Sequence, residues 1–365
     1  MIYFSILAIV IMLSGLDMRL YGNLQSRSVN AVGLIIALFF AVIVGLRWDV
    51  GVDYMPYYNF ATGDYTYDYQ IGRLEPVPRF LALLTSTTSV PFYVWFMVMG
   101  FIQIFYVQRA LKSVYYPILC WGTFFFIAIF LHEQLNIVRQ GAAVCIVLFS
   151  YQYVLKKDFK RYLLMVLLAC MFHKSAVVAL PIYLLRQIDF RLSLFWQAVV
   201  VVCCSVLSSV AITKIFSLFT NLAVMMGYGN AMELLLDDGM NSEKGSGLGI
   251  LFNYLRYAIL IFYYPKLRKE YSSHGFNFFY LLSFIYLCIY PAAFYSIYIA
   301  RMFMYFRYAD VITYAFLMHY LTNKSETYLP FCIMLVLTLV QIFLYVSSGA
   351  PWTFIWESPV INKFI

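Results

Sequence analysis

The chain has 365 residues, of which 64% are hydrophobic and only 12% are charged, about half the charged share of an ordinary soluble domain. A soluble fold of this composition would expose more apolar surface than water tolerates, whereas a lipid bilayer accommodates it. The net charge of +8 is spread over short basic clusters between apolar runs, a pattern that sets membrane topology and argues against a nucleic-acid partner. We therefore predict an all-α, polytopic membrane bundle, a single transmembrane domain over residues 1–365.

The apolar runs mark the expected membrane spans, since a spanning helix needs about 20 mostly apolar residues. The first run has no basic residues before it and no small-residue cleavage site after it, so we expect it to remain as an anchor. Val77–Leu84 is too short to cross and is expected to be a half-helix. The expected spans are Ile2–Leu16, Asn30–Leu46, Pro91–Gln108, Val114–Leu131, Val138–Leu155, Tyr162–Leu185, Leu192–Ile212, Gly249–Tyr264, Phe276–Ala300, Met302–Leu321 and Tyr328–Ser347.

The loops between the spans fall into a basic set and an acidic set. Arg109–Lys112, Lys156–Arg161 and Lys266–Glu270 carry an excess of Lys and Arg, whereas Arg47–Arg79 and Tyr228–Leu248 carry an excess of Asp and Glu. The positive-inside rule places the basic loops in the cytoplasm and the two long acidic loops outside.

The number of spans between two loops must place each loop on its expected side of the membrane, and two arrangements satisfy this condition. Either Tyr162–Leu185 crosses and the ambiguous run Ile215–Met226 crosses too, which gives about 12 spans. Or Tyr162–Leu185 bends back at His173-Lys174, which gives about 10.

The first outer loop combines a cation, carboxylates and aromatic rings. Arg47 stands at the mouth of a helix, Asp53 follows it, and Tyr54 and Tyr57 come next with the spacing of one helical face. Arginine binds phosphate oxygens in a bidentate fork, and a neighbouring carboxylate can act as a general base. The alternative is an interfacial helix with a snorkelling arginine and an aromatic belt.

Ionisable residues at membrane depth are candidates for function because an unpaired charge is costly there. Arg139 lies inside an apolar run and needs an anion, either Glu133 or a ligand. His173 and Lys174 interrupt another apolar stretch, and histidine is the side chain best suited to move protons near neutral pH.

Further arginines lie near the same predicted face. Arg307 and Asp310 are spaced i, i+3 and can neutralise each other, whereas Arg301 and Arg256 have no such partner in sequence. In the predicted topology, Arg47, Arg139 and these three arginines gather around an outward-facing cavity. Such a cluster fits a pyrophosphate or an anionic glycan held without a metal, and the cysteines, all inside apolar stretches, indicate no metal centre or other cofactor.

The order of these motifs resembles the EpsG family of Wzy-like bacterial polymerases, which build O-antigen and exopolysaccharide. The resemblance runs from Tyr3 to about Leu321, and Val52 stands where the family more often has Thr. The motifs that carry it are Arg47 followed by Val50-Gly51-Val52-Asp53-Tyr54 and Tyr57, then Arg139-Gln140-Gly141, then Phe172-His173-Lys174-Ser175, and then Arg301 with Tyr305-Phe306.

The resemblance implies a glycosyltransferase of the GT-C type at the outer face of the bacterial inner membrane. It would move a glycan from undecaprenyl pyrophosphate onto another lipid-linked repeat unit, with a chain-length regulator protein as a further partner. Asp53 or His173 would take the acceptor proton, with Glu75 a further candidate for the base. The residues expected to bind substrate are Arg47, Tyr54, Tyr57, Glu75, Arg139, Arg256, Arg301 and Arg307.

Two other functions remain open from the sequence. A flippase for lipid-linked oligosaccharides would carry charges along a path through both leaflets and would often show internal symmetry. A membrane acyltransferase would use His173 as its base.

Overall fold

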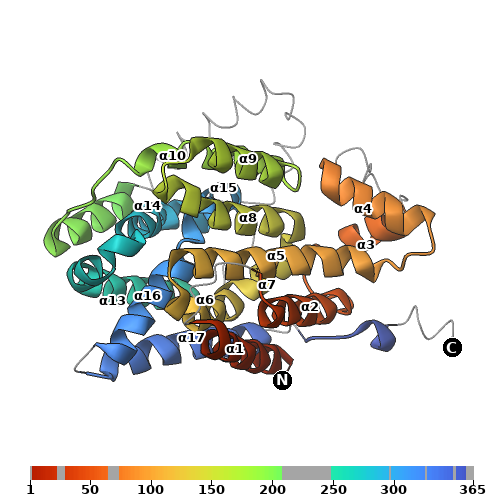
Figure 1. Ribbon diagram of the computed structural model, residues 1–365, viewed down its shortest axis with the longest axis horizontal. Coiled ribbons are helices and arrows are strands. Elements are labelled where there is room, and N and C mark those ends of the chain that lie inside the picture. The colour runs from red at the N-terminus through yellow and green to blue at the C-terminus, as the bar shows by residue number, and fades with distance from the viewer. Residues whose placement is uncertain are drawn as a thin grey trace.

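The computed structural model describes residues 2–22, 29–64, 74–207, 248–295, 297–324, 327–347 and 351–358. Within these residues the regular structure is helical, and the helices pack into a bundle (Figure 1). The β contact that the described residues contain is an isolated antiparallel bridge between Arg47 and Phe354. The all-α, polytopic membrane bundle predicted from the composition is confirmed.

Six helices of the described residues are long and apolar enough to cross a membrane. They agree with the expected spans at the start, middle and end of the chain, and they make this a multi-pass membrane protein. They are α1 (Ile2–Tyr21), α5 (Tyr93–Val114), the composite helix Tyr116–Asn136, α8 (Val138–Leu155), Phe276–Phe294 within α14 (Phe276–Tyr295), and α17 (Leu329–Ser347).

The centre of the bundle is formed by α5, which lies between α2 (Ala31–Gly45) and α8 (Figure 1). Burial distinguishes inner helices from outer ones. In α8, 83% of the residues are buried, whereas in α17 only 22% are. The outward residues of α17 are apolar, as expected of a helix that faces lipid. The composite helix beside α5 consists of η3 (Tyr116–Ile118), α6 (Leu119–Phe125), a π-helical turn η4 (Phe126–Phe130) and α7 (Leu131–Asn136).

The predicted span Tyr162–Leu185 is a helical hairpin. It consists of α9 (Phe159–Cys170), η5 (Lys174–Ala179) and α10 (Ile182–Leu185). The Tyr162 hydroxyl near the start of α9 donates to the Ala179 carbonyl at 2.5 Å, so the two arms run antiparallel. With 12 residues, α9 is about 18 Å long, which is too short for a hydrocarbon core of about 30 Å. Of the two alternatives, the bend at His173-Lys174 is the one that the structure shows.

Two other predicted boundaries are corrected. The expected span Met302–Leu321 is divided into α15 (Ile297–Arg307) and α16 (Asp310–Asn323). The break falls where two charged residues, Arg307 and Asp310, interrupt the apolar run. The expected span Gly249–Tyr264 is the first part of a longer helix, α13 (Leu248–Tyr271). Leu192–Ile212 is described as a helix only over Leu194–Leu207, and Ile215–Met226 lies outside the described residues.

The bundle has two distinct ends (Figure 1). The C-terminal turns of α1 and α5 carry Arg19 and Lys112, and we call this end the basic end. At the other end lie α3 (Tyr54–Thr62), α4 (Pro76–Thr87) and the turn between α9 and η5. The amide of Val77 in α4 donates to the carbonyl of Met171 in that turn at 3.1 Å. We call it the site end. The short helix α4 confirms that Val77–Leu84 is a half-helix.

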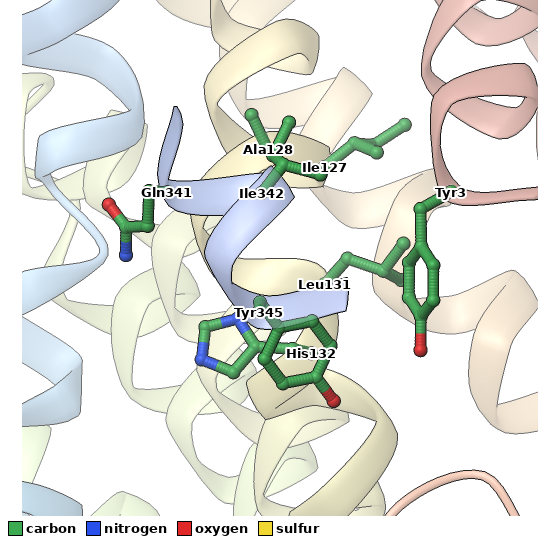
Figure 2. Close-up of a pocket in the computed structure, with 8 residues that line it drawn as sticks. All are labelled: Tyr3, Ile127, Ala128, Leu131, His132, Gln341, Ile342 and Tyr345. Atoms are coloured by element: carbon green, nitrogen blue, oxygen red, sulfur yellow. The ribbon is translucent and has the colours of Figure 1, made fainter. Parts of the chain in front are cut away.

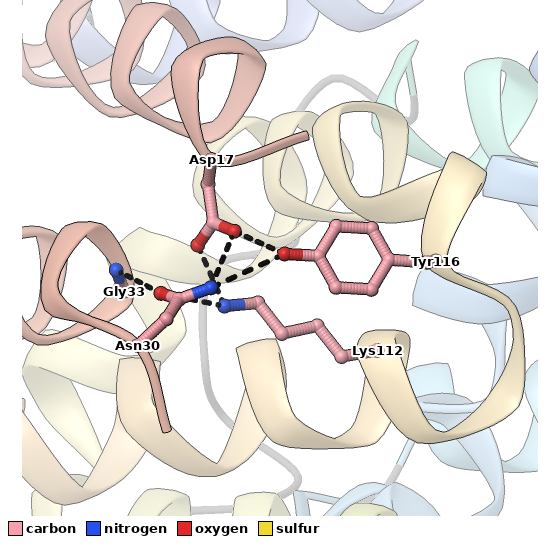
Figure 3. Close-up of polar contacts among 5 residues, drawn as sticks. All are labelled: Asp17, Asn30, Gly33, Lys112 and Tyr116. Carbon is pink, nitrogen blue, oxygen red and sulfur yellow. Dashed lines mark hydrogen bonds and ion pairs between the residues drawn. The ribbon is translucent and has the colours of Figure 1, made fainter. Parts of the chain in front are cut away.

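At the basic end, a buried polar network joins α1, α2 and α5 (Figure 3). The Lys112 ammonium lies 2.6 Å from Asp17 Oδ2, and the side-chain amide of Asn30 donates to Asp17 Oδ1 at 2.8 Å. The Tyr116 hydroxyl donates to the same carboxylate. Asn30 also caps α2, because its Oδ1 accepts from the Gly33 amide at 2.7 Å. Asp17 was not among the residues singled out from the sequence, because its partners are distant along the chain.

At the site end, the segment after α17 packs against the loop that follows α2. The Trp48 amide donates to the Thr353 carbonyl at 2.9 Å, and the Ile355 amide donates to the Leu46 carbonyl at 3.0 Å. These two bonds hold the backbone on both sides of Arg47.

Candidate functional site

A cluster of charged and aromatic side chains lies at the site end and draws on five segments that are far apart in sequence. Each member contacts another member or lies within its electrostatic range. We call these residues the central cluster: Asp53 and Tyr57 at α3, Glu75 at the start of α4, Arg139 at the start of α8, His173 at the turn before η5, and Arg301 in α15.

The first ion pair of the central cluster joins Arg139 to Glu75. Arg139 Nη1 donates to Glu75 Oε2 at 2.5 Å, while the backbone amide of Lys174 donates to Glu75 Oε1 at 3.3 Å. Both oxygens of this buried carboxylate are therefore occupied. The sequence left Glu133 or a ligand as the partner of Arg139, and the structure supplies Glu75 instead. Glu75 thus fixes the Arg139 guanidinium and the turn between α9 and η5 together.

Tight packing at the start of α8 explains the glycine that follows Arg139. Arg139 is the second residue of α8, and Gly141 follows it within the first turn. A Cβ at Gly141 would lie 2.1 Å from Gln134 Oε1, so any larger residue would displace the buried Gln134 amide. This close approach accounts for the glycine of the Arg139-Gln140-Gly141 motif.

The second ion pair joins Arg301 to Asp53 and is looser. Arg301 Nη2 lies 3.7 Å from Asp53 Oδ2, and their side chains are 40% and 36% exposed. Asp53 occupies the N-cap position of α3 but makes no side-chain cap hydrogen bond, although an aspartate at this position commonly accepts one. Its carboxylate is therefore available to a reactant that enters from the water side.

Two arginines of the central cluster carry unsatisfied donors. Arg139 Nε and Arg301 Nε are both buried from water and have no hydrogen-bond partner among the described residues. Buried polar groups are nearly always paired, so each exception calls for a physical reason. Each of these donors is able to bind an anion.

Tyr57 forms one wall of the cluster. Its ring stacks on Trp95 with centroids 5.0 Å apart, and the Arg139 guanidinium lies 5.7 Å from its centroid. Burial raises the pKa of the Tyr57 hydroxyl above its usual range, although Arg139 opposes the shift. Tyr57 therefore stays a neutral hydroxyl beside the cations.

His173 and Arg301 are also connected through neutral side chains. The Ser175 hydroxyl lies 2.7 Å from His173 Nδ1 and 2.8 Å from the Tyr305 hydroxyl. Gln140 Nε2 donates to Ser175 Oγ at 3.2 Å and to the carbonyl of Arg301 at 2.8 Å. Ser175, Tyr305 and Gln140 stand in the sequence only as members of motifs, and their position beside a central histidine becomes visible only in the fold.

Arg47 and Tyr54 lie deeper than the central cluster. Arg47 is fully buried, and its guanidinium donates to the carbonyls of Val44, Val50 and Leu135 at 2.7, 3.1 and 3.3 Å. Burial lowers the pKa of Arg47 to about 10. The Tyr54 hydroxyl donates to the Arg47 carbonyl, and its ring stacks on a neighbouring phenylalanine of α5. These contacts anchor the loop that carries Asp53.

The two remaining arginines singled out from the sequence have other partners. Arg307 donates to both oxygens of Glu133 at 2.8 and 2.9 Å, so the expected neutralisation by Asp310 is replaced by a pair formed between α7 and α15. Arg256 is fully buried in α13 and donates to Asn253 in the same helix. Neither residue contacts the central cluster directly in a hydrogen bond or ion pair of the described residues.

A small pocket lies between α1, α17 and the π-helical turn (Figure 2). Tyr3, His132, Gln341 and Tyr345 supply its polar groups, and the other lining residues are apolar. It has room for about one water molecule, so it is too small for a sugar. No residue of the central cluster lines it.

The fold and the cluster together define a class: a multi-pass membrane protein whose helix ends bring arginines and carboxylates together at one end of the bundle. The EpsG family profile matches residues 30–357, nearly the whole chain. The chain belongs to the EpsG family, a family of Wzy-like polymerases, and is accordingly a polysaccharide polymerase-like membrane protein. Searches of curated proteins and of solved structures find no significant match.

Proposed function

We propose that this protein is a polymerase of lipid-linked glycans that works at the outer face of the bacterial inner membrane. It transfers a glycan from undecaprenyl pyrophosphate to a hydroxyl group of a second lipid-linked repeat unit. The observation that carries this proposal is the pair of unsatisfied guanidinium donors, Arg139 Nε and Arg301 Nε, in one cluster of a polymerase-family chain. The excess of Lys and Arg at the opposite end supports the outward orientation.

In the proposed reaction, the bond between the anomeric carbon of the donor glycan and the pyrophosphate oxygen breaks. A bond forms between that carbon and the acceptor oxygen, and the acceptor proton passes to the Asp53 carboxylate. The leaving pyrophosphate gains negative charge, which Arg139 and Arg301 stabilise because they are already held in place. Asp53 later returns its proton to water.

The structure favours Asp53 over Glu75 as the base. Glu75 is buried and uses both oxygens to hold Arg139 and the Lys174 amide. The Asp53 side chain is 36% exposed, and its ion-pair partner among the described residues, Arg301, lies 3.7 Å away, a separation longer than a good hydrogen bond. We assign Glu75 the task of positioning Arg139, and Asp53 that of accepting the proton.

In the proposal, Arg47, Tyr54 and Tyr57 position the reacting groups. Arg47 and Tyr54 fix the loop that leads to Asp53, and the Tyr57 ring packs against the Arg139 guanidinium. We propose that Arg307 holds α15 against α7 through its pair with Glu133, and that Arg256, which bonds to Asn253 of its own helix, has a structural role in α13.

The test uses the purified protein in lipid nanodiscs with undecaprenyl-pyrophosphate-linked repeat units. We expect Arg301→Ala to lower polymer formation by about 100-fold or more, the usual effect of removing one preorganised donor. Arg161→Ala is the matched control, because Arg161 is 70% exposed and lies outside the cluster.

Two results would contradict the proposal. Polymer of normal amount and length from Arg301→Ala would remove that residue's role. Movement of lipid-linked units across the bilayer by the wild-type protein, without a new glycosidic bond, would identify a flippase, and transfer of labelled acyl groups would identify an acyltransferase.

A further inference from the structure

His173 is the end of a hydrogen-bond chain that crosses three structural elements. Gln140 of α8 and Tyr305 of α15 both contact Ser175 Oγ, at 3.2 and 2.8 Å, and Ser175 Oγ lies 2.7 Å from His173 Nδ1. The backbone amide of Ser175 also donates to His173 Nδ1, at 3.3 Å. His173 is thereby the side-chain cap of η5.

The direction of each hydrogen bond follows from what each group can donate. A backbone amide and the Nε2 amino group of Gln140 can only donate, so His173 Nδ1 accepts from the Ser175 amide and Ser175 Oγ accepts from Gln140. The single proton of Ser175 Oγ is then free to point to Nδ1, and the Tyr305 hydroxyl donates to Ser175. An imidazole whose Nδ1 accepts carries its proton on Nε2 when neutral.

The other nitrogen of His173, Nε2, is not used by the contacts that hold the ring. Within the described residues no hydrogen bond is formed at Nε2, whereas both Nδ1 contacts come from η5. The charged groups within electrostatic range of His173 are Glu75, Arg139, Lys174 and Arg301. Glu75 is paired with Arg139, so the charges left near the ring are Lys174 and Arg301, and Arg301 is only loosely paired with Asp53 at 3.7 Å.

We propose that His173 is a hydrogen-bond donor to the pyrophosphate through Nε2–H, and that Ser175 and Tyr305 are positioning residues that fix this tautomer. The inference rests on the proposed function, and it assigns the proton-accepting step to Asp53 alone. A ring held with its proton on Nε2 has no free acceptor for the acceptor hydroxyl, so it binds the leaving group instead.

Two substitutions at His173 separate a donor from a base. Glutamine places an N–H group near the position of Nε2, whereas asparagine reaches only the position of Nδ1 and keeps the cap of η5. We expect His173→Gln to bind undecaprenyl pyrophosphate in nanodiscs within about tenfold of the wild type, and His173→Asn to lose about 100-fold or more. If His173 were the base, both variants would bind undecaprenyl pyrophosphate as the wild type does and both would lose polymer formation.

Ser175 is tested by a double-mutant cycle, which isolates coupling between neighbours. Ser175→Ala alone should weaken pyrophosphate binding by about tenfold, and Ser175→Thr, which keeps the hydroxyl, should restore it. In the His173→Gln background Ser175→Ala should have no further effect, because an amide has no tautomer to fix. A purely structural role of Ser175 would produce the same loss in both backgrounds.

The outcomes separate this inference from the proposed function. Equal loss of pyrophosphate binding in His173→Gln and His173→Asn overturns the donor role, even when the wild-type protein makes polymer. A wild-type protein that binds pyrophosphate with the predicted variant pattern but forms no glycosidic bond overturns the polymerase and leaves the donor role in place.

Discussion

The network at the basic end yields a prediction that separates folding from chemistry. Asp17 and Lys112 form an ion pair at 2.6 Å with side chains that are 0% and 4% exposed. Removing one member of such a pair leaves a buried charge without compensation and costs about 3–5 kcal/mol. The two single substitutions should not cost the same amount, because the remaining partners differ.

Lys112→Met leaves the Asp17 carboxylate with two donors, Asn30 and Tyr116. The loss should lie near the lower limit, about 3 kcal/mol, and lower the melting temperature by roughly 5–10 °C. Asp17→Ala leaves the Lys112 ammonium with the Asn30 carbonyl oxygen, at 3.4 Å. Its loss should lie near the upper limit, about 5 kcal/mol.

The assay is thermal unfolding of the purified variants in one detergent, followed by intrinsic fluorescence and by the fraction that stays monodisperse. The control is Asp17→Leu with Lys112→Met, which replaces the pair by apolar side chains and should recover most of the stability. The KM of the folded fraction should stay unchanged in all three proteins. A greater loss in Lys112→Met than in Asp17→Ala, or no loss in either, would refute the reasoning.

Three further predictions concern the site end. Glu75→Gln keeps the acceptor for the Lys174 amide but removes the charge that holds Arg139, so KM for the lipid-linked donor should rise about tenfold or more; an unchanged KM would show that Arg139 does not depend on Glu75. Arg47→Ala removes a guanidinium bonded to three carbonyls and should lower the free energy of unfolding by about 3 kcal/mol. The yield of folded protein should fall, with little change in the KM of the folded fraction. A normal yield with a raised KM would instead indicate direct substrate binding. A cysteine at Arg161 and one at Gln187, at the two ends of the hairpin, introduced singly into a cysteine-free chain, should react with a membrane-impermeant thiol reagent from the same side of the membrane, and labelling from opposite sides would contradict the hairpin.

The amino-acid sequence predicts the architecture well because composition and apolar length act locally. Expected and observed boundaries coincide for Val138–Leu155 and nearly so for Tyr328–Ser347. The sequence predicted less where polar residues interrupt an apolar run. Tyr162–Leu185 folds back because His173 adopts an extended backbone conformation and caps η5, and a hydropathy window averages over such a break.

The sequence singled out the residues of the central cluster, but it predicted only some of the contacts between them. Charged groups at membrane depth pointed to Arg139, His173 and Arg301, and the structure brings all three into one cluster. Their partners depend on segments that only the fold brings together, so Glu75 and Asp53 could not be assigned to them by spacing. Arg47 was expected beside the substrate, and the structure surrounds it with backbone carbonyls, a detail that no sequence pattern contains.

The most direct test of the central claim is the affinity of the nanodisc-embedded protein for undecaprenyl pyrophosphate. The account predicts that Arg139→Ala and Arg301→Ala each weaken binding by about tenfold or more, whereas Arg161→Ala binds as the wild type does. Wild-type affinity in both cluster variants would show that these two guanidinium groups do not hold the pyrophosphate, and the proposed chemistry would then have to be abandoned.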